Sequence, residues 1–285
     1  MVDTLLFSAP GSLVPTLTAG LFGLLIGSFL NVVIHRLPKM MQRDFDNYVA
    51  QENGQPLPHE GRYNLIVPRS ACPSCGHQIT ALENIPVLSY AVLRGKCRAC
   101  KAPISLRYPI VEAIAALLSV WVIWHFGSGW AGLASLLFVY LLLAMTFIDA
   151  DTQLLPDDLT LSLLWAGLLI NLNGLFVPLQ EAVIGAAAGY VALWAVYWLF
   201  KLTTGKEGMG YGDFKLLAAI GAWLGWKMLP LVILLSSLVG AIVGVALITL
   251  ARRGRDNPIP FGPYLAVAGI IAMLYGEAIV ASYLG

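Results

Sequence analysis

Apolar residues fill long runs of this chain, and charged residues gather in the gaps between the runs. Divided at its charges and its proline and glycine breakers, the chain gives eight apolar segments near the roughly 20 residues that cross a bilayer as a helix. The predicted helices are 13–34, 110–126, 130–148, 159–176, 181–200, 214–227, 229–251 and 262–283. The pattern predicts an all-α polytopic membrane protein of about eight transmembrane helices, embedded in the lipid bilayer.

Composition and charge support this interpretation and orient the helices. Of 285 residues, 58% are hydrophobic and 12% are charged, whereas about a quarter of the residues of soluble proteins are charged. If the predicted helices alternate in direction, 16 of the 17 Lys and Arg residues lie on one side, and only Lys227 lies on the other. The positive-inside rule makes that side the cytoplasm and places both termini outside it. The first apolar run is long and lacks a basic leading region, so no cleaved signal peptide is predicted.

Residues 35–107 form the only soluble segment of any size, and they carry two C-x-x-C motifs. Cys72 and Cys75 form one pair and Cys97 and Cys100 the other, with 21 residues between the pairs. This spacing is typical of a paired-knuckle zinc site, and four thiolates around Zn²⁺ leave no open position, which indicates a structural metal. A redox motif and a pair of disulfides are the competing interpretations; the doubled motif argues against the first and the cytoplasmic side against the second. His77 is expected to be a spectator.

Two acids stand at the ends of predicted helices on the cytoplasmic side. Asp149 ends the apolar run at 130–148, and Asp213 follows three alternating glycines in Gly208-Met-Gly210-Tyr-Gly212. Those glycines can take positive φ and allow close packing. The following helix, 214–227, is short enough to leave Asp213 recessed below the membrane surface. Charge at a membrane span is costly and usually functional, so Asp149 and Asp213 are the candidate site residues.

Other polar positions carry weaker signals. Ser28 and Asn31 lie three residues apart and predict a helix–helix contact. Glu112 is expected near the start of a helix, as a capping carboxylate or a functional one. Asp157 and Asp158 are expected to cap the helix at 159–176. The proline-rich turn at 258–263 is expected to be structural.

If Asp149 and Asp213 converge, repulsion and burial favour one proton shared by the pair. Such a pair can take a proton from water and polarise a peptide carbonyl, as in aspartic proteases, with no metal in the site. In the alternative, the two acids are interfacial residues paired with Lys215 and Lys206.

Four signatures in order resemble the bacterial type IV prepilin leader peptidases. They are Gly27-Ser-Phe-Leu-Asn31, the doubled C-x-x-C, Ile148-Asp149 with Leu155-Pro156-Asp157, and Gly210-Tyr-Gly212-Asp213. The resemblance spans residues 13 to 283. It implies that Asp149 and Asp213 are the catalytic pair of an aspartic endopeptidase in the bacterial inner membrane. The substrates implied are type IV prepilins and the pseudopilins of type II secretion, cut after a Gly at the cytoplasmic face to remove a short basic leader.

The resemblance also implies a second activity, because peptidase-only relatives lack the zinc-bearing segment. Members that have it N-methylate the new terminus, usually a Phe, with S-adenosylmethionine. The expected division is therefore a first helix at 1–34, a tetra-Cys domain linked to methylation at 35–107, and a peptidase core at 108–285. No dinucleotide fingerprint follows a predicted strand, so no residue is assigned to the methyl donor; no nucleic-acid partner is expected.

Two rival functions remain open at this point. A proton-coupled transporter would use Asp149 and Asp213 as proton carriers and the zinc knuckle as a docking module. The second rival is a non-catalytic membrane scaffold of a secretion apparatus. Gradient-dependent flux would distinguish the transporter, whereas full function after Asp213→Asn would distinguish the scaffold.

Overall fold

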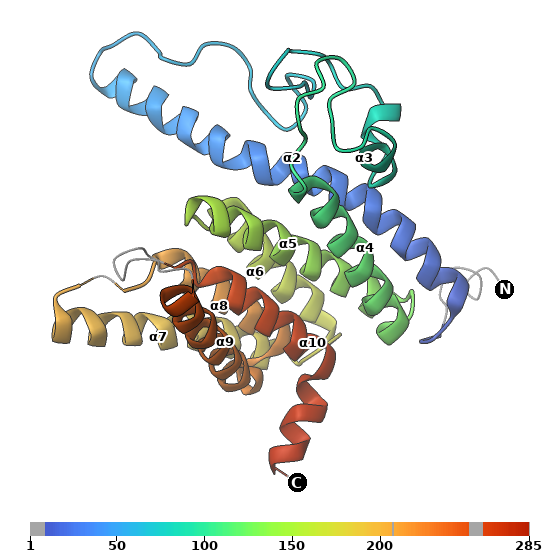
Figure 1. The fold of residues 1–285 in the computed structure, drawn as a ribbon. Helices are drawn as coiled ribbons and strands as arrows, with labels where there is room; N and C mark the ends of the chain where they lie inside the picture. Colours follow the sequence, from blue (N-terminus) through green and yellow to red (C-terminus); the bar gives the residue numbers. More distant parts are fainter. Residues whose placement is uncertain (1–8, 207, 251–258, 285) are drawn as a thin grey trace. The chain divides into compact units, whose positions relative to one another are not determined.

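The computed structural model describes residues 9–206, 208–250 and 259–284, and its regular structure there is helical apart from two isolated β-bridges. Figure 1 shows the order of the helices. The α-helices are α2 (Leu13–Glu52), α3 (Leu88–Val92), α4 (Arg107–Phe126), α5 (Trp130–Thr152), α6 (Asp157–Ile170), α7 (Leu179–Thr204), α8 (Tyr211–Leu224), α9 (Leu229–Leu250) and α10 (Gly262–Leu284). Short 3₁₀ turns lie at Leu82–Asn84, Asn171–Asn173 and Trp226–Met228.

The predicted all-helical membrane class is confirmed, with changes at several helix ends. Six described helices are long and apolar enough to cross a membrane: α2, α4, α5, α7, α10, and the stretch Trp226–Leu247 that includes most of α9. Helices α6 and α8 have only 14 residues each, about 21 Å at the helical rise, which is shorter than the bilayer core. The segment predicted at 159–176 therefore ends early, because Asn171 turns the chain into a 3₁₀ turn.

Helix α2 continues far beyond the predicted end at residue 34. Its 40 residues pass through Pro38 and end at Glu52, a length of about 60 Å, twice the thickness of a bilayer core of about 30 Å. The prediction was wrong there because it ended the helix at the first charged residues, and a solvated helix needs no apolar run to continue. The segment between the first two predicted spans thus begins with about five turns of helix.

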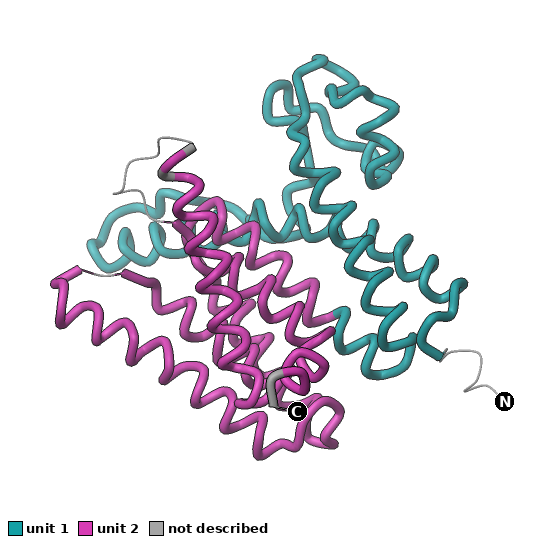
Figure 2. Tube along the Cα trace, turned by 60° about the horizontal axis from the view of Figure 1, so that its bottom comes forward, with its two compact units in different colours: residues 1–136 teal, residues 137–285 magenta. Residues whose placement is uncertain are grey.

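The chain divides into two compact units between Leu136 and Leu137 (Figure 2). In unit 1, α2 packs closely against α4. A Cβ added at Gly27 would lie 2.6 Å from the Cα of Glu112, so only glycine permits this approach. The predicted polar contact is confirmed, because Ser28 hydrogen-bonds to Glu112 and the Asn31 side chain donates to the Tyr108 carbonyl at 3.1 Å.

In unit 2, the short helix α8 is the buried centre. It contacts α6, α7, α9 and α10, and its residues from Asp213 to Leu224 are buried except Lys215. Small residues permit the contact with α7: a Cβ at Gly185 would collide with the carbonyl oxygen of Gly221, and one at Gly189 would lie 2.6 Å from that of Leu217. The small-residue cluster of α7 is therefore a helix-packing surface, as the sequence suggests.

Asn171 closes the buried end of α8. Its side-chain amide donates to the carbonyls of Ala222 and Trp223 at 3.0 and 3.1 Å, and its oxygen accepts from the N–H groups of Phe176 and Val177 at 3.0 and 3.2 Å. The side chain is fully buried, so one residue satisfies two carbonyls at the helix end and two loop N–H groups.

Replacing Asn171 with Ala should leave these four backbone groups without their partner. We expect the free energy of unfolding in detergent to fall by about 3 kcal/mol, since each orphaned buried group is costly. Thermal unfolding of the purified variant measures this. Asn173→Ala, an exposed change in the same turn, is the control and should stay within about 0.5 kcal/mol. Equal melting temperatures for the two variants would contradict the role given to Asn171.

Candidate functional site

Asp149 lies in the last turn of α5 and is 5% exposed. Its Oδ2 accepts a hydrogen bond of 2.9 Å from the backbone N–H of Gly262, the first residue of α10. The carboxylate thus lies at the positive end of the α10 dipole, a favourable place for an anion. A Cβ at residue 262 would lie 2.6 Å from this oxygen, which explains the glycine. Gly262 belongs to the turn at 258–263, which was expected to be only structural. This residue instead holds the Asp149 carboxylate in place.

Asp213 lies in the first turn of α8 and is 6% exposed. It is close enough to Asp149 that the charge of one carboxyl acts on the other. Leu155 packs beside the backbone at Gly212, next to Asp213, and at Gly262, the donor to Asp149. Its side chain would be 2.7 Å from a Cβ at Gly212 and 3.3 Å from one at Gly262. The last turn of α5 and the first turns of α8 and α10 therefore bring the two candidate acids together.

The neighbouring acids differ from this pair in both burial and partner. Asp151, Asp157 and Asp158 are all exposed. Lys215 pairs with Asp157, with its Nζ 2.6 and 2.8 Å from the two carboxylate oxygens. The capping prediction was wrong, because Pro156 occupies the N-cap of α6 and the two acids lie in its first turn. Lys215 is thus engaged by a surface acid rather than by Asp149 or Asp213.

The glycines before Asp213 serve close packing rather than an unusual backbone. Gly210 has φ −82° and ψ 151°, and neither Gly208 nor Gly212 has a positive φ. A Cβ at Gly208 would lie 2.9 Å from the Phe200 ring, whereas one at Gly210 would meet nothing closer than Asp213 Oδ2 at 3.8 Å. The expectation of positive φ was therefore wrong, and the requirement for glycine is steric at Gly208 and Gly212.

Asp213 is recessed along the axis of α7. Gly185 lies opposite Gly221 and Gly189 opposite Leu217, so one further turn places Asp213 opposite Leu193. Helix α7 continues to Thr204, about 16 Å beyond that level at the helical rise. The contact between the rings of Tyr197 and Tyr211, with centroids 5.5 Å apart, fits the same register. A short α8 beside a long α7 therefore places the acid well below the end of its neighbour.

Two buried carboxyl groups whose charges act on each other favour a state in which one of them is protonated. No ion pair to either acid occurs among the described residues. One carboxylate can then accept a proton from water while the other carboxylic acid donates to a carbonyl oxygen.

The four cysteines of unit 1 form a second candidate site. The sulfur atoms of Cys72, Cys75, Cys97 and Cys100 all lie within 4.8 Å of one another, and those of Cys72 and Cys100 are 3.8 Å apart. A tetrahedron of sulfurs about 2.3 Å from a central Zn²⁺ has edges of about 3.8 Å. The cluster therefore fits a four-coordinate metal.

Both C-x-x-C motifs fold into the same local structure. The N–H of Cys72 donates to the carbonyl of His77 and that of Cys97 to the carbonyl of Ala102, at 2.9 and 2.8 Å. Each turn has a left-handed residue four positions after its first cysteine, Gly76 with φ 71° and Lys101 with φ 60°. The doubled motif is thus a pair of matching knuckles.

Hydrogen bonding already distinguishes the Cys72 thiol from that of Cys75. Backbone N–H groups of Ser74 and Cys75 lower the pKa of the Cys72 thiol to about 6. A backbone hydrogen bond at His77 lowers the pKa of Cys75, but the neighbouring sulfurs and burial outweigh it and raise the value to about 11. Four sulfurs this close therefore favour a cation that lets all of them ionise. His77 lies outside the cluster, with its Nε2 3.2 Å from Glu83 Oε2.

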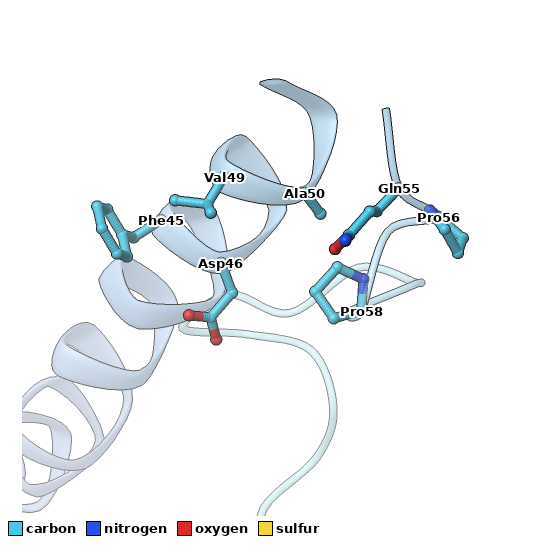
Figure 3. Close-up of a pocket in the computed structure, with 7 residues that line it drawn as sticks. All are labelled: Phe45, Asp46, Val49, Ala50, Gln55, Pro56 and Pro58. Carbon is cyan, nitrogen blue, oxygen red and sulfur yellow. The ribbon is translucent and has the colours of Figure 1, made fainter. Parts of the chain in front are cut away.

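A hollow of about 220 Å³ lies at the far end of α2, lined by that helix and the loop after it (Figure 3). Its lining residues are Phe45, Asp46, Val49, Ala50, Gln55, Pro56 and Pro58. The one acid among them, Asp46, accepts hydrogen bonds from Gln42 and His59 at 2.7 and 2.9 Å. With its carboxylate engaged in this way and no second titratable group in the lining, the hollow offers less chemistry than the paired acids.

Sequence reasoning missed the contacts that support the candidate residues. Nothing in the sequence marks Gly262 as the donor to Asp149, or Leu155 as the side chain that packs beside both Gly212 and Gly262. Gly262 lies 113 positions from Asp149, and only the packing of α5, α8 and α10 brings these residues together.

Two family models match successive parts of the chain. Residues 21–126 match the family model of the Bacterial Peptidase A24 N-terminal domain, and residues 136–245 match that of the Type IV leader peptidase family. No solved structure matches the chain.

Three similar curated proteins all have the name Prepilin leader peptidase/N-methyltransferase. That of Aeromonas salmonicida is 62% identical over 268 residues, covering 93% of this chain and 92% of the relative. That of Stutzerimonas stutzeri is 58% identical over 279 residues, covering 98% and 96%. That of Pseudomonas aeruginosa is 60% identical over 265 residues, covering 93% and 91%. The chain belongs to the type IV leader peptidase family, in the branch whose members are prepilin leader peptidases and N-methyltransferases.

Proposed function

We propose that this protein is a membrane aspartic endopeptidase that removes the leader from type IV prepilins and N-methylates the new terminus. The observation that carries the proposal is the pair of buried carboxyl groups, Asp149 and Asp213, at the ends of two helices in unit 2. Close relatives with both activities in their names support it. The same relatives give no support to the transporter alternative.

In the cleavage step, the acid pair acts on one water molecule. One carboxylate takes a proton from that water, and the other carboxylic acid donates to the carbonyl oxygen of the scissile peptide. The N–H of Gly262 holds the Asp149 carboxylate in a fixed direction. The recessed position beside α7 limits bulk water at Asp149 and Asp213. The side of α7 also gives a substrate segment a helical surface to pack against.

The charge distribution supports an orientation for this chemistry. With 16 of 17 basic residues on one side, the paired acids and the four cysteines belong to the cytoplasmic face, and both termini lie outside it. The location is the inner membrane, and the substrates include the pseudopilins of type II secretion as well as prepilins. These assignments follow from the charge rule and the family.

The four cysteines are proposed to hold a structural Zn²⁺, and the methyl donor is S-adenosylmethionine. The metal contributes folding energy, because a tetrahedral site with four protein ligands leaves no position for chemistry. We assign methylation to the cysteine segment, residues 35–107, and cleavage to the helices that follow it. Helix α4 packs on α2 within unit 1, so the structural support of the segment includes both helices.

Asp149→Asn and Asp213→Asn should each lower prepilin cleavage by about 100- to 10,000-fold, the range for losing a general acid or base. Each amide keeps the shape of the side chain but cannot exchange the shared proton. Incubation of the detergent-purified variants with a prepilin, followed by mass measurement of the product, tests this without any ion gradient.

Asp157→Asn is the matched control, because it removes a partly exposed ion pair with Lys215 that is worth at most about 1 kcal/mol. It should cleave at the wild-type rate and change mainly stability. Wild-type cleavage by either Asp149→Asn or Asp213→Asn would refute the assignment of the catalytic pair.

Cys72→Ser should remove bound zinc, because three sulfurs and a hydroxyl hold the ion far less well than four thiolates. Metal analysis of the purified protein should fall from one zinc per chain to nearly none, and proteolysis within residues 53–106 should become faster. His77→Ala should retain one zinc, since its ring lies outside the sulfur cluster. Full zinc occupancy in the Cys72 variant would contradict the four-cysteine site.

A further inference from the structure

Glu112 is a buried carboxylate that the proposed cleavage chemistry does not use. It lies in the second turn of α4, within the helix pair α2–α4 of unit 1, and is 7% exposed. Burying a carboxylate is costly unless a cation or strong donors compensate it. No ion pair to Glu112 occurs in the part of the chain that the structure describes. The buried Arg36 of the same unit donates instead to the carbonyls of Asn64 and Pro68, at 2.8 and 2.6 Å.

Three parts of unit 1 converge on this carboxylate. Its Oε2 accepts from the backbone N–H of Val87 at 2.8 Å, and Ser28 of α2 provides a second hydrogen bond. Asn31, nearly one turn beyond Ser28, binds the Tyr108 carbonyl at the start of α4. We call Ser28, Asn31, Val87, Tyr108 and Glu112 the Glu112 cluster. It lies where α2 and α4 meet the loop segment that carries the four cysteines.

The backbone at Val87 is strained where it meets the carboxylate. Val87 has φ 59° and ψ −46°, a conformation that a β-branched residue rarely takes. Strain of this kind concentrates at functional sites, where the surrounding structure holds it in place. The strained backbone of Val87 directs its N–H at the Glu112 carboxylate, and this hydrogen bond favours the negatively charged form of the side chain.

The carboxylate still has unused acceptor positions for a cationic partner. An ionised carboxylate offers about four lone-pair positions, and the two hydrogen bonds from Val87 and Ser28 occupy two of them. An ammonium group carries three N–H donors and a full positive charge, which matches what the cluster lacks. The ligand class that fits is a primary ammonium group.

We propose that Glu112 binds the α-ammonium group of the cleaved substrate and accepts its proton before methyl transfer. This inference rests on the proposed methyltransferase activity and assigns its amine-binding residue. It would place the second reaction in unit 1, whereas the paired acids of cleavage belong to unit 2.

The step balances with the sulfonium methyl donor named above. One proton passes from the ammonium nitrogen to the Glu112 carboxylate, which leaves a neutral amine. The amine lone pair forms the N–C bond as the S–C bond breaks, and the sulfur keeps that electron pair. The product is a positively charged methylammonium group and a neutral thioether, and Glu112 then releases its proton to water.

Glu112→Gln separates this role from a structural one. The amide oxygen can still accept from Val87 and Ser28, so the local fold is retained, but the negative charge is lost. Purified enzyme is given the cleaved, unmethylated substrate, made beforehand by wild-type enzyme without methyl donor. We expect methylation to fall by about 100-fold or more, with prepilin cleavage and zinc content unchanged. Ser119→Ala, a buried change two turns along α4, is the control and should methylate normally.

Binding gives a readout that does not depend on turnover. Wild-type enzyme should bind the cleaved substrate more tightly than the same polypeptide with an acetylated N-terminus, and Glu112→Gln should lose that preference. On wild-type enzyme alone, a carbodiimide should join the substrate's α-amine to Glu112, located by mass spectrometry; coupling confined to other carboxylates would overturn the proposal.

The outcomes separate the inference from the function on which it rests. If wild-type enzyme fails to methylate the cleaved substrate, the proposed methyltransferase activity fails and the inference falls with it. If wild-type enzyme methylates it and Glu112→Gln does so at the same rate, with the same preference for the free amine, only the inference is wrong.

Discussion

The structure depends on keeping two acidic side chains buried at one place in an apolar helical unit. Burial makes two negative charges at close range unfavourable, so the groups around Asp149 and Asp213 must hold them and leave room for a shared proton. Gly262 supplies the backbone donor, and the glycines at 212 and 262 allow the chain to come close to the carboxyl groups and to Leu155. The chemistry proposed for the pair needs no further group, since water and a peptide carbonyl complete it.

Helix length is the second feature that shapes this site. Helix α8 is too short to cross a bilayer alone, but it is enclosed by other helices, which shield its backbone and its apolar side chains from lipid. Helix α7 continues for several turns beyond the start of α8. The loop that leads to Asp213 therefore runs along the side of α7. Gly208 and Phe200 are in close contact along this stretch. A short helix beside a long one therefore places Asp213 well below the end of its neighbour.

In unit 1, the segment between α2 and α4 needs a source of stability other than a hydrophobic core, because it has few buried apolar residues. Two matching knuckles bring four sulfurs to one point, where a metal can replace the missing core. Glu83 links the knuckles, since it lies 3.2 Å from His77 and 3.8 Å from Arg98. The segment is also joined to the helix pair through Val87 and Glu112. Folding of the cysteine segment and the position of a buried charge in the helices are therefore connected.

The sequence by itself determined the helical membrane class and the four-cysteine cluster, and it picked out Asp149 and Asp213, which the structure buries in one unit. These features are local, because apolar length, charge sign and C-x-x-C spacing have their physical meaning within about twenty residues. Tertiary structure decided the rest: the Gly262 donor, the position of Leu155 beside Gly212 and Gly262, the pairing of Lys215 with Asp157, and the strained Val87 opposite Glu112. Each of these joins residues at least 25 positions apart, and no local pattern records which distant helix end will lie beside another. The helix ends at Glu52 and Ile170 belong to the same class, since a solvated extension and a buried asparagine, rather than hydrophobicity, set them.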